Sequence, residues 1–348
     1  MNRDTELRGR DFITLLDFER KDIDSILDLA TDLKRRMRTP ERDMPVLLDR
    51  KTLFMLFYNM SLRTRNSFEV AMTHLGGNAH FLQPGAIYAP ALKGEEKAYT
   101  TERISDVARV LSEMGEGIAI RLYGKHTGWE YGKGDLILRE FTRWASIPVI
   151  NMEDDVYHPC QALADLLTMR ERGGRLEGKK FVMSWAYSGS PEKPLAVPQS
   201  AIIGASFYGM DITLAHPKGF ELDPAIIERV KENVGKYGGS FAVANDMDEA
   251  FEGADFVYPK CWTAARYLPP NKTPGDWDAI ERLFDQNKQW ITNQGRMDLT
   301  NNAWYMHCLP ADRDQEVTDE IIDGPRSVVW EEAGNRLHTE KALLAMLL

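Results

Sequence analysis

Residues 61–65 bring two hydroxyls and two arginines together within five positions, in the order Ser-Leu-Arg-Thr-Arg. They follow an apolar run, residues 52–58, that is typical of a buried strand, and they precede an amphipathic helical pattern. A helix N-terminus points backbone N–H groups outward and its dipole favours an anion, and arginines add bidentate contacts to phosphate. The same residues also suit an ordinary helix cap, with Ser61 or Thr64 as the capping residue. The stretch alone does not decide between these two interpretations.

Other polar side chains stand where further predicted strands end, which is where α/β sheets bind their ligands. The candidates are Ser61, Arg63, Thr64, Arg121, His158, Gln161, Lys260, His307, Cys308 and Arg336. Taken singly, each has an ordinary structural explanation; Cys308, for example, could be a small buried hydrophobe. Taken together, three arginines, a histidine and hydroxyls at strand ends suit an oxyanion-rich substrate, most simply a phosphate.

Signatures of metals and nucleotides do not accompany these residues. His158 and His307 have no carboxylate or cysteine ligands nearby at metal-binding spacing. The segment after the predicted strand at residues 180–187 holds three prolines and no GxGxxG, and the chain has no Walker A sequence. We therefore expect a site without metal or cofactor, and binding of NAD or ATP is disfavoured.

The elements that must position these residues alternate between strand and helix along the whole chain, which predicts parallel sheets covered on both faces. Predicted strands are residues 52–58, 78–83, 117–122, 147–152, 180–187, 211–215, 240–244, 256–260, 304–309 and 327–330. Predicted helices are residues 20–38, 61–76, 101–114, 135–144, 199–208, 224–237 and 339–348, with another opening at Pro159 and ending at Gly173. Residues 84–101 form a long polar loop, which is usually functional or mobile. The fold class is α/β, with two doubly wound parallel-sheet domains.

Length and composition agree with this organisation. A chain of 348 residues is more than one core usually serves, and 43% hydrophobic with 28% charged residues is ordinary for a globular protein. The pattern changes near His158, so we predict a first domain of residues 1–157, with residues 331–348 packing back on it, and a second domain of residues 158–330.

Net charge and cysteine content restrict the partners and the compartment. The formal charge of −10 argues against nucleic acid and anionic membranes as partners. Three scattered cysteines without a CxxC indicate neither a disulfide framework nor a structural zinc site. No apolar segment resembles a secretory signal or a membrane span. These features predict a cytoplasmic location.

Three motifs, residues 61–65, 158–161 and 307–310, occur in an order and spacing that resemble the signatures of the aspartate/ornithine carbamoyltransferase family. The resemblance covers nearly the whole chain and implies two α/β domains with the active site in the cleft between them. Residues 180–198 and 258–262 resemble the knotted branch, which includes the N-acetylornithine and N-succinylornithine carbamoyltransferases. That resemblance implies a trefoil knot in the second domain, a rare exception to the rule against knots.

The resemblance also implies roles for individual residues. Carbamoyl phosphate would be bound by Ser61, Leu62, Arg63, Thr64, Arg121, His158, Gln161, Cys308, Leu309 and Arg336. Within this set, the catalytic residues would be Arg63, Thr64, Arg121, His158, Gln161 and Cys308. The amine acceptor would be bound by Glu153, Lys260 and Asp312.

The implied reaction moves the carbamoyl group from carbamoyl phosphate to the amine of an amino acid or another amine acceptor, giving a ureido product and phosphate. The implied assembly is a homotrimer with active sites shared between neighbours, and residues 84–101 are placed to reach the neighbouring site. The expected partners are therefore carbamoyl phosphate and an amine-bearing small molecule. The alternative is a non-catalytic homologue that binds carbamoyl phosphate or phosphate and regulates a partner.

The acceptor motifs depart from the best-known members. Lys260, Cys261 and Trp262 stand where the ornithine enzymes have a Ser-Met-Gly loop, which argues against plain ornithine. The sequence around His307 lacks the His-Pro-Leu-Pro-Arg of the aspartate enzymes. Asp312 at the rim favours an acceptor with an additional positive charge, or a smaller diamino acid, over an acylated ornithine.

Overall fold

The computed structural model describes residues 6–39 and 44–348 and divides the chain into two compact units. The first unit comprises the described parts of residues 1–127 together with residues 132–163 and 336–348, and the second comprises residues 128–131 and 164–335. The chain passes from one unit to the other within two helices, α5 (Pro159–Gly173) and α12 (Val329–Leu347). The predicted limits at residues 157 and 330 fall a few residues before these exchanges.

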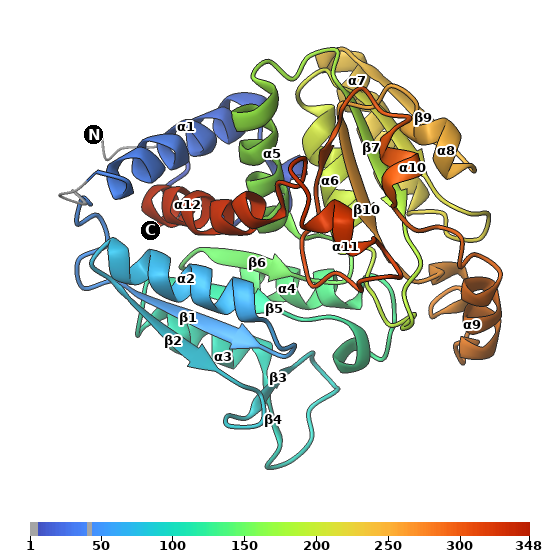
Figure 1. The fold of residues 1–348 in the computed structure, drawn as a ribbon. Helices are drawn as coiled ribbons and strands as arrows, with labels where there is room; N and C mark the ends of the chain where they lie inside the picture. The colour runs from blue at the N-terminus through green and yellow to red at the C-terminus, as the bar shows by residue number, and fades with distance from the viewer. Residues whose placement is uncertain (1–5, 40–43) are drawn as a thin grey trace. The chain divides into compact units, whose positions relative to one another are not determined.

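The first unit is built on a four-stranded parallel sheet in the order β2-β1-β5-β6. The strands are β1 (Thr52–Phe57), β2 (Asn78–Leu82), β5 (Gly117–Arg121) and β6 (Val149–Glu153). β5 and β6 are buried along their whole length, as expected for parallel strands covered on both faces. Figure 1 shows the covering helices α2 (Leu62–His74), α3 (Ile104–Ser112) and α4 (Lys133–Trp144), and α1 (Arg20–Met37) lies farther from the strands.

The core of this unit explains the helical patterns in the sequence. On one face of the sheet, Phe54 and Ile118 pack with Ile104 and Ala108 from α3 and with Phe141 from α4. These helical residues recur at the spacing of one helix face, which is why α3 and α4 form amphipathic helices here. The sheet is thereby fixed between helices, and its strand ends are held in register.

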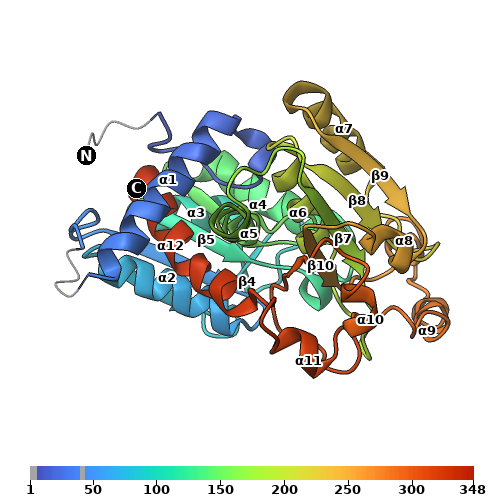
Figure 2. The same ribbon diagram turned by 45° about the horizontal axis from the view of Figure 1, so that its top comes forward.

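The second unit contains a five-stranded parallel sheet in the order β11-β10-β7-β8-β9. Its strands are β7 (Lys180–Trp185), β8 (Asp211–Ala215), β9 (Ser240–Ala244), β10 (Phe256–Lys260) and β11 (Trp304–Tyr305). Its helices are α6 (Ala196–Ser206), α7 (Pro224–Tyr237), α8 (Met247–Phe251), α9 (Trp277–Asp285), α10 (Gln294–Met297) and α11 (Asp319–Ile322). Figure 2 shows α7 beside the β8–β9 end of this sheet. The α6 helix is buried on all sides, which matches its apolar composition.

Two parts of the predicted secondary structure are wrong. Residues 327–330 do not form a strand: Ser327 makes only an isolated bridge to Tyr305, and α12 begins at Val329. A short apolar run cannot be assigned to strand or helix from periodicity alone. Because α12 begins ten residues before the predicted start at residue 339, Arg336 lies inside this helix and not after a strand.

The predicted loop at residues 84–101 is also more ordered than expected. It contains β3 (Ala89–Ala91), which pairs in parallel with β4 (Thr101–Arg103). The helix predicted from residue 101 consequently begins only at Ile104. The parallel α/β class itself is confirmed, whereas the interdomain cleft and the knot remain predictions.

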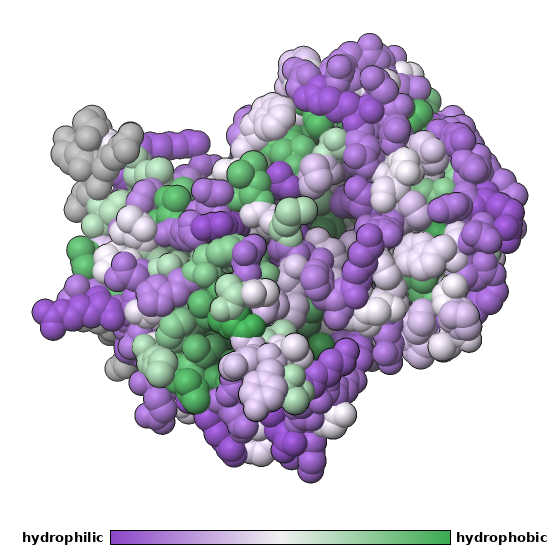
Figure 3. Space-filling model, turned by 90° about the horizontal axis from the view of Figure 1, so that it is seen from below, coloured by the Kyte–Doolittle hydropathy of each residue, from purple (hydrophilic) through white to green (hydrophobic). Residues whose placement is uncertain are grey.

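Large hydrophobic side chains are exposed on the first unit. They are Val46, Met60, Leu62, Tyr88, Tyr99, Val110, Met114 and Leu136. Figure 3 shows a broad apolar area toward the lower left of the face seen from below and smaller apolar patches elsewhere on that face. Across residues 6–39 and 44–348, no helix combines the length and the apolar character that crossing a membrane requires.

Candidate active site

The turn between β1 and α2 carries the first motif. Ser61 has an extended backbone and caps α2: its Oγ accepts a hydrogen bond from the Thr64 N–H at 3.1 Å. The two interpretations of this stretch are therefore compatible, since a capped helix N-terminus can still face an anion. A pocket of 460 Å³ lies at this turn. Its lining is Phe57, Tyr58, Asn59, Met60, Ser61, Leu62, Arg65, Asn66, Glu69, Phe81 and Gln83.

Strand register brings the next candidates beside this turn. In the sheet Phe57 pairs with Arg121, and Arg121 pairs with Glu153, so the last residues of β1, β5 and β6 are neighbours. Asn59 fixes the two chain ends further, because its side chain donates to the Tyr123 carbonyl at 3.2 Å and accepts from the Tyr123 N–H at 2.9 Å. Parallel pairing thus gathers residues that are up to a hundred positions apart in the sequence.

Arg121, Glu153 and His158 form a buried cluster at this edge. Arg121 makes an ion pair with Glu153 and donates to the Tyr123 hydroxyl at 3.0 Å. His158 Nε2 lies 3.5 Å from the same Glu153 carboxylate. Burial, followed by the positive charges of Arg336, Arg121 and Arg63, lowers the pKa of His158 well below its ordinary value. The imidazole is therefore neutral at pH 7 and can donate a hydrogen bond but not serve as a strong acid.

Arg336 joins three helices of the first unit. From α12 it donates through Nη1 to Gln161 Oε1 at 2.8 Å and through Nη2 to Thr64 Oγ1 at 3.1 Å. It also binds Glu340 at 3.1 and 2.8 Å. Burial is the largest single influence and lowers the pKa of Arg336, but Glu340, Cys160 and Glu153 together raise that pKa above its ordinary value, so the guanidinium stays charged. Because both acceptor oxygens face Arg336, the Thr64 hydroxyl hydrogen and the Gln161 amide hydrogens point elsewhere.

The second unit gathers a different set around Glu316, which is completely buried. Its carboxylate accepts the backbone N–H groups of Cys261 and Asp312, each at 2.8 Å, and lies 3.9 Å from Lys260 Nζ and 3.2 Å from His307 Nε2. Burial opposes its ionisation, but His307 and Lys260 lower the pKa of Glu316 below its ordinary value. Glu316 is therefore a carboxylate that organises the end of β10.

The third motif is attached to the same carboxylate. His307 Nδ1 accepts the Leu309 N–H at 2.9 Å, so the imidazole hydrogen is on Nε2, toward Glu316. The His307 N–H donates to Glu332 at 2.9 Å. Leu309 has a φ of 57°, a left-handed conformation that is strained for a leucine and that is found most often at functional sites. The Cys308–Leu309 backbone is thus held in one geometry from both sides.

Asp312 holds the proline-rich segment of the second unit. It accepts the Ser188 hydroxyl at 2.5 Å and pairs with Lys193 at 3.2 Å, and Gly189 N–H donates to Gln315 at 2.5 Å. The charge of Asp312 is therefore matched by Lys193. Asp312 consequently gives no support to the expected preference for an acceptor with an additional positive charge.

The structure brings the predicted residues together in two sets. The first unit collects Ser61, Leu62, Arg63, Thr64, Arg121, Glu153, His158, Gln161 and Arg336, and the second collects Lys260, Cys308, Leu309 and Asp312. Glu153 was grouped with the acceptor residues from the sequence, yet it contacts Arg121 and His158. Sequence reasoning missed Glu316 and Glu340. The spacing of four between Arg336 and Glu340 on a helix was an available signal, whereas the loop position of Glu316 offered none.

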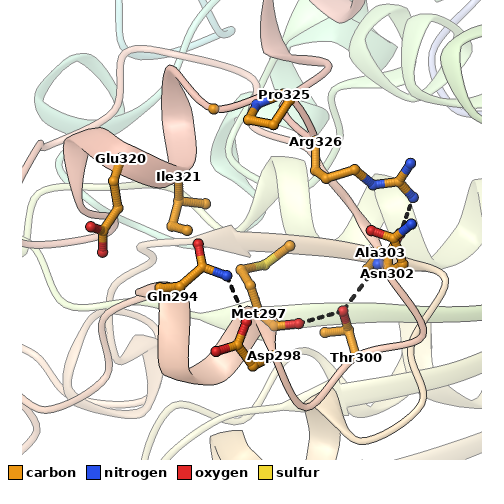
Figure 4. Close-up of a pocket in the computed structure, with 11 residues that line it drawn as sticks. Gln294, Met297, Asp298, Thr300, Asn302, Ala303, Glu320, Ile321, Pro325 and Arg326 are labelled. Atoms are coloured by element: carbon orange, nitrogen blue, oxygen red, sulfur yellow. Dashed lines mark hydrogen bonds between the residues drawn. The ribbon is translucent and has the colours of Figure 1, made fainter.

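A second pocket, of 340 Å³, lies on the second unit (Figure 4). Residues of α10 and α11 and the segment around Arg326 line it, and it contains none of the predicted site residues. Among residues 6–39 and 44–348, no group of three or more His, Cys, Asp or Glu side chains could hold a metal ion.

The two units match two known domain families. Residues 10–171 match the carbamoyl-P binding domain of aspartate/ornithine carbamoyltransferase, and residues 186–347 match its Asp/Orn binding domain. The chain therefore belongs to the aspartate/ornithine carbamoyltransferase family, as the three motifs predicted, and it is a carbamoyltransferase.

Two relatives with different names are similar to this chain to nearly the same degree. The N-acetylornithine carbamoyltransferase of Xylella fastidiosa strain 9a5c is 39% identical over 303 residues, covering 85% of this chain and 88% of the relative. The ornithine carbamoyltransferase of Pyrococcus abyssi is 38% identical over 344 residues, covering 98% and 96%. These relatives are enzymes, and they give no support to a regulatory, non-catalytic function.

Solved structures agree with the fold. The crystal structure of an acetylornithine transcarbamylase complexed with acetylcitrulline has a TM-score of 0.89 at 36% identity, covering 97% of this chain and 99% of the other. A mutant N-acetyl-L-ornithine transcarbamylase complexed with carbamyl phosphate and N-succinyl-L-norvaline has a TM-score of 0.90, covering 97% and 100%. The α/β class of both units is confirmed by this similarity.

Proposed function

We propose that this carbamoyltransferase uses carbamoyl phosphate to carbamoylate the side-chain amine of an N-acylated ornithine, with ornithine as the second candidate. The single observation that supports the donor half is the Arg336 guanidinium, which joins Thr64 of α2 to Gln161 of α5 in the same unit as Arg121 and His158. The predicted roles of the individual site residues are part of this proposal.

The charge balance of the second set supports an acylated acceptor. Its two carboxylates are already matched, Glu316 by Lys260 and His307 and Asp312 by Lys193. An acceptor with a free α-ammonium group would require a carboxylate that these pairs do not leave available. An acylated α-nitrogen carries no charge and therefore needs no such carboxylate. Ornithine remains the second candidate because relatives of nearly the same identity carry that name.

The hydrogen-bond donors that we place around the carbamoyl group account for the reaction. The neutral acceptor amine attacks the carbamoyl carbon, and the bond to the phosphate oxygen breaks. Thr64, Arg121 and neutral His158 stabilise the carbonyl oxygen as it gains negative charge, and preorganised donors of this kind are worth about 3 kcal/mol each. Phosphate leaves toward Arg63 and Arg121, and it accepts the proton that the attacking amine loses.

The assembly and location belong to the same proposal. Family members are trimers, and Met60 and Leu62 are 96% and 73% exposed beside the candidate site in a single chain. Large apolar side chains in such a position are typical of a protein interface. We therefore propose a homotrimer with shared active sites. The three cysteines are free thiols, which fits a cytoplasmic location.

An acceptor panel tests the function. Purified protein is given carbamoyl phosphate with N-acetylornithine, N-succinylornithine, ornithine, shorter diamino acids or putrescine, and phosphate release is measured. We expect the highest kcat/KM with an acylated ornithine. Efficient turnover of free ornithine alone would reject the acyl preference. Tight binding of carbamoyl phosphate without release for any amine would favour the regulatory alternative.

A further inference from the structure

Glu340 is a completely buried carboxylate with no role in the mechanism above. It lies one helical turn after Arg336 on α12 and accepts from Arg336 Nε at 3.1 Å and from Nη2 at 2.8 Å. Arg336 in turn carries the hydrogen bonds to Gln161 and Thr64. Glu340 thus accepts from one edge of the guanidinium, whereas Gln161 and Thr64 accept from its other N–H groups.

The geometry of these contacts fixes the orientation of the guanidinium plane. A guanidinium is planar, so two contacts along one edge determine where the remaining N–H groups point. With Nε and one Nη2 hydrogen directed to Glu340, Nη1 reaches Gln161 and Nη2 reaches Thr64. Without the carboxylate, the long side chain of Arg336 would have other rotamers available within reach of α2.

We propose that Glu340 is a positioning residue of the carbamoyl phosphate site, which holds Arg336 toward Gln161 and Thr64 and offsets part of its positive charge. The proposal rests on the function proposed above. Beside the proposed donor site, Arg121 pairs with Glu153 and Arg336 pairs with Glu340, so the charge state of Glu340 controls how much positive charge Arg336 offers to an anionic substrate.

The ionisation of Glu340 gives this role a measurable signature. Burial raises the pKa of Glu340 to about 7, although Arg336 and the Ser67 hydroxyl on α2 both favour the carboxylate. The other titratable group that senses it is the Cys160 thiol on α5, whose pKa burial raises. Below pH 7 Glu340 is protonated and the charge of Arg336 is fully available to the donor substrate. Above pH 7 the carboxylate offsets that charge, so the KM for carbamoyl phosphate should rise.

Three variants separate positioning from charge. Glu340→Gln keeps an oxygen acceptor for Arg336 but stays neutral at every pH, and Glu340→Leu removes both functions at similar volume. Glu331→Gln is the matched control, because it exchanges the same groups on α12 at a surface pair with Arg172. The KM values for carbamoyl phosphate and for the acceptor are measured for each protein between pH 6 and 8.

We expect Glu340→Leu to raise the KM for carbamoyl phosphate about tenfold, as for loss of one partner of a charge-assisted hydrogen bond, with little change for the acceptor. Glu340→Gln should bind carbamoyl phosphate more tightly than the parent at pH 8. The ratio of the KM of Glu340→Gln to the KM of the parent should approach 1 toward pH 6. Taking this ratio also cancels the titration of the substrate itself. Glu331→Gln should match the parent throughout.

Two results would overturn the proposal. One is a KM for carbamoyl phosphate in Glu340→Gln that follows the parent at every pH. The other is a Glu340→Leu protein that folds and binds carbamoyl phosphate as the parent does. If Glu340→Leu does not fold, the pH series of Glu340→Gln decides. If no amine supports turnover in the parent, calorimetry with inorganic phosphate across the same pH range tests Glu340 independently of the function.

Discussion

The two sets of site residues differ in how their charges are balanced. In the first unit, Arg121 pairs with Glu153 and Arg336 pairs with Glu340, and the imidazole of His158 is neutral. In the second unit, Lys260 and Lys193 face Glu316 and Asp312, one cation for each carboxylate. Because burial raises the pKa of Glu340 to about 7, part of the positive charge of Arg336 stays available to a phosphate dianion near neutral pH, whereas the fully paired second set suits an acceptor that must arrive with an uncharged amine. The difference supports the proposed division of the reaction, in which the first set binds carbamoyl phosphate and the second binds the acceptor.

The largest effect should come from Arg121, whose loss removes charge from the first set. Arg121→Ala deletes a donor to the carbonyl oxygen and leaves the buried Glu153 without its ion-pair partner. We expect kcat to fall about a thousandfold. Steady-state kinetics measure it, with circular dichroism to confirm folding. A decrease in kcat of less than about tenfold in a folded variant would contradict a catalytic role for Arg121.

An intermediate effect should come from Glu316, the organising carboxylate of the second set. Glu316→Gln keeps the shape but removes the negative charge that pairs with Lys260, so the KM for the acceptor should rise about tenfold or more, with carbamoyl phosphate little affected. Loss of one member of a buried charge cluster should also cost about 3 kcal/mol of stability. Unfolding by denaturant and acceptor kinetics measure the two effects.

The pH dependence of this variant gives a sharper test. Because the folded-state pKa of Glu316 lies below the ordinary value of 4.5, its ionisation stabilises the fold above that value and less as the pH falls below it. The difference in Tm between the parent and Glu316→Gln should therefore be widest near pH 7 and should begin to narrow as the pH falls below about 4.5. A difference that is constant with pH would mean that shape, and not charge, stabilises this site.

The smallest effect should come from Asp312. It is partly exposed and already paired with Lys193, and such pairs contribute little. Asp312→Asn should change acceptor kcat/KM by less than about threefold and should leave the preference between acetylornithine and ornithine unchanged. If this variant reversed that preference, Asp312 would contact the acceptor directly, and the charge balance of the second set would have to be revised.

The first set could largely be predicted from the sequence. Its residues lie at strand ends and at a helix N-terminus, and hydrophobic periodicity indicates where such elements begin and end. Arg121 and Glu153 are brought together by parallel register, a rule that applies to any such sheet. Arg336 was predicted as a site residue because it follows the apolar run at residues 327–330, but that run resembles a strand, so the position of Arg336 inside α12 was missed.

The second set was less accessible for a physical reason. Glu316 follows a loop, and no periodic pattern marks a loop residue whose carboxylate turns inward to two backbone N–H groups. The charge of Asp312 was visible, but its pairing with Lys193 joins positions 119 residues apart and depends on tertiary structure. The sequence therefore shows which charges are present more readily than which of them are already neutralised.

The neutral state of His158 has a consequence for how the rate should respond to pH. Since this imidazole keeps one form across the physiological range, it cannot produce the ascending limb of a rate profile. That limb would instead follow the acceptor, because an alkyl amine with a pKa of about 10.4 is almost entirely an unreactive ammonium ion at pH 7. Turnover would then track the small free-base fraction of the acceptor, and the basicity of the substrate would set the alkaline optimum.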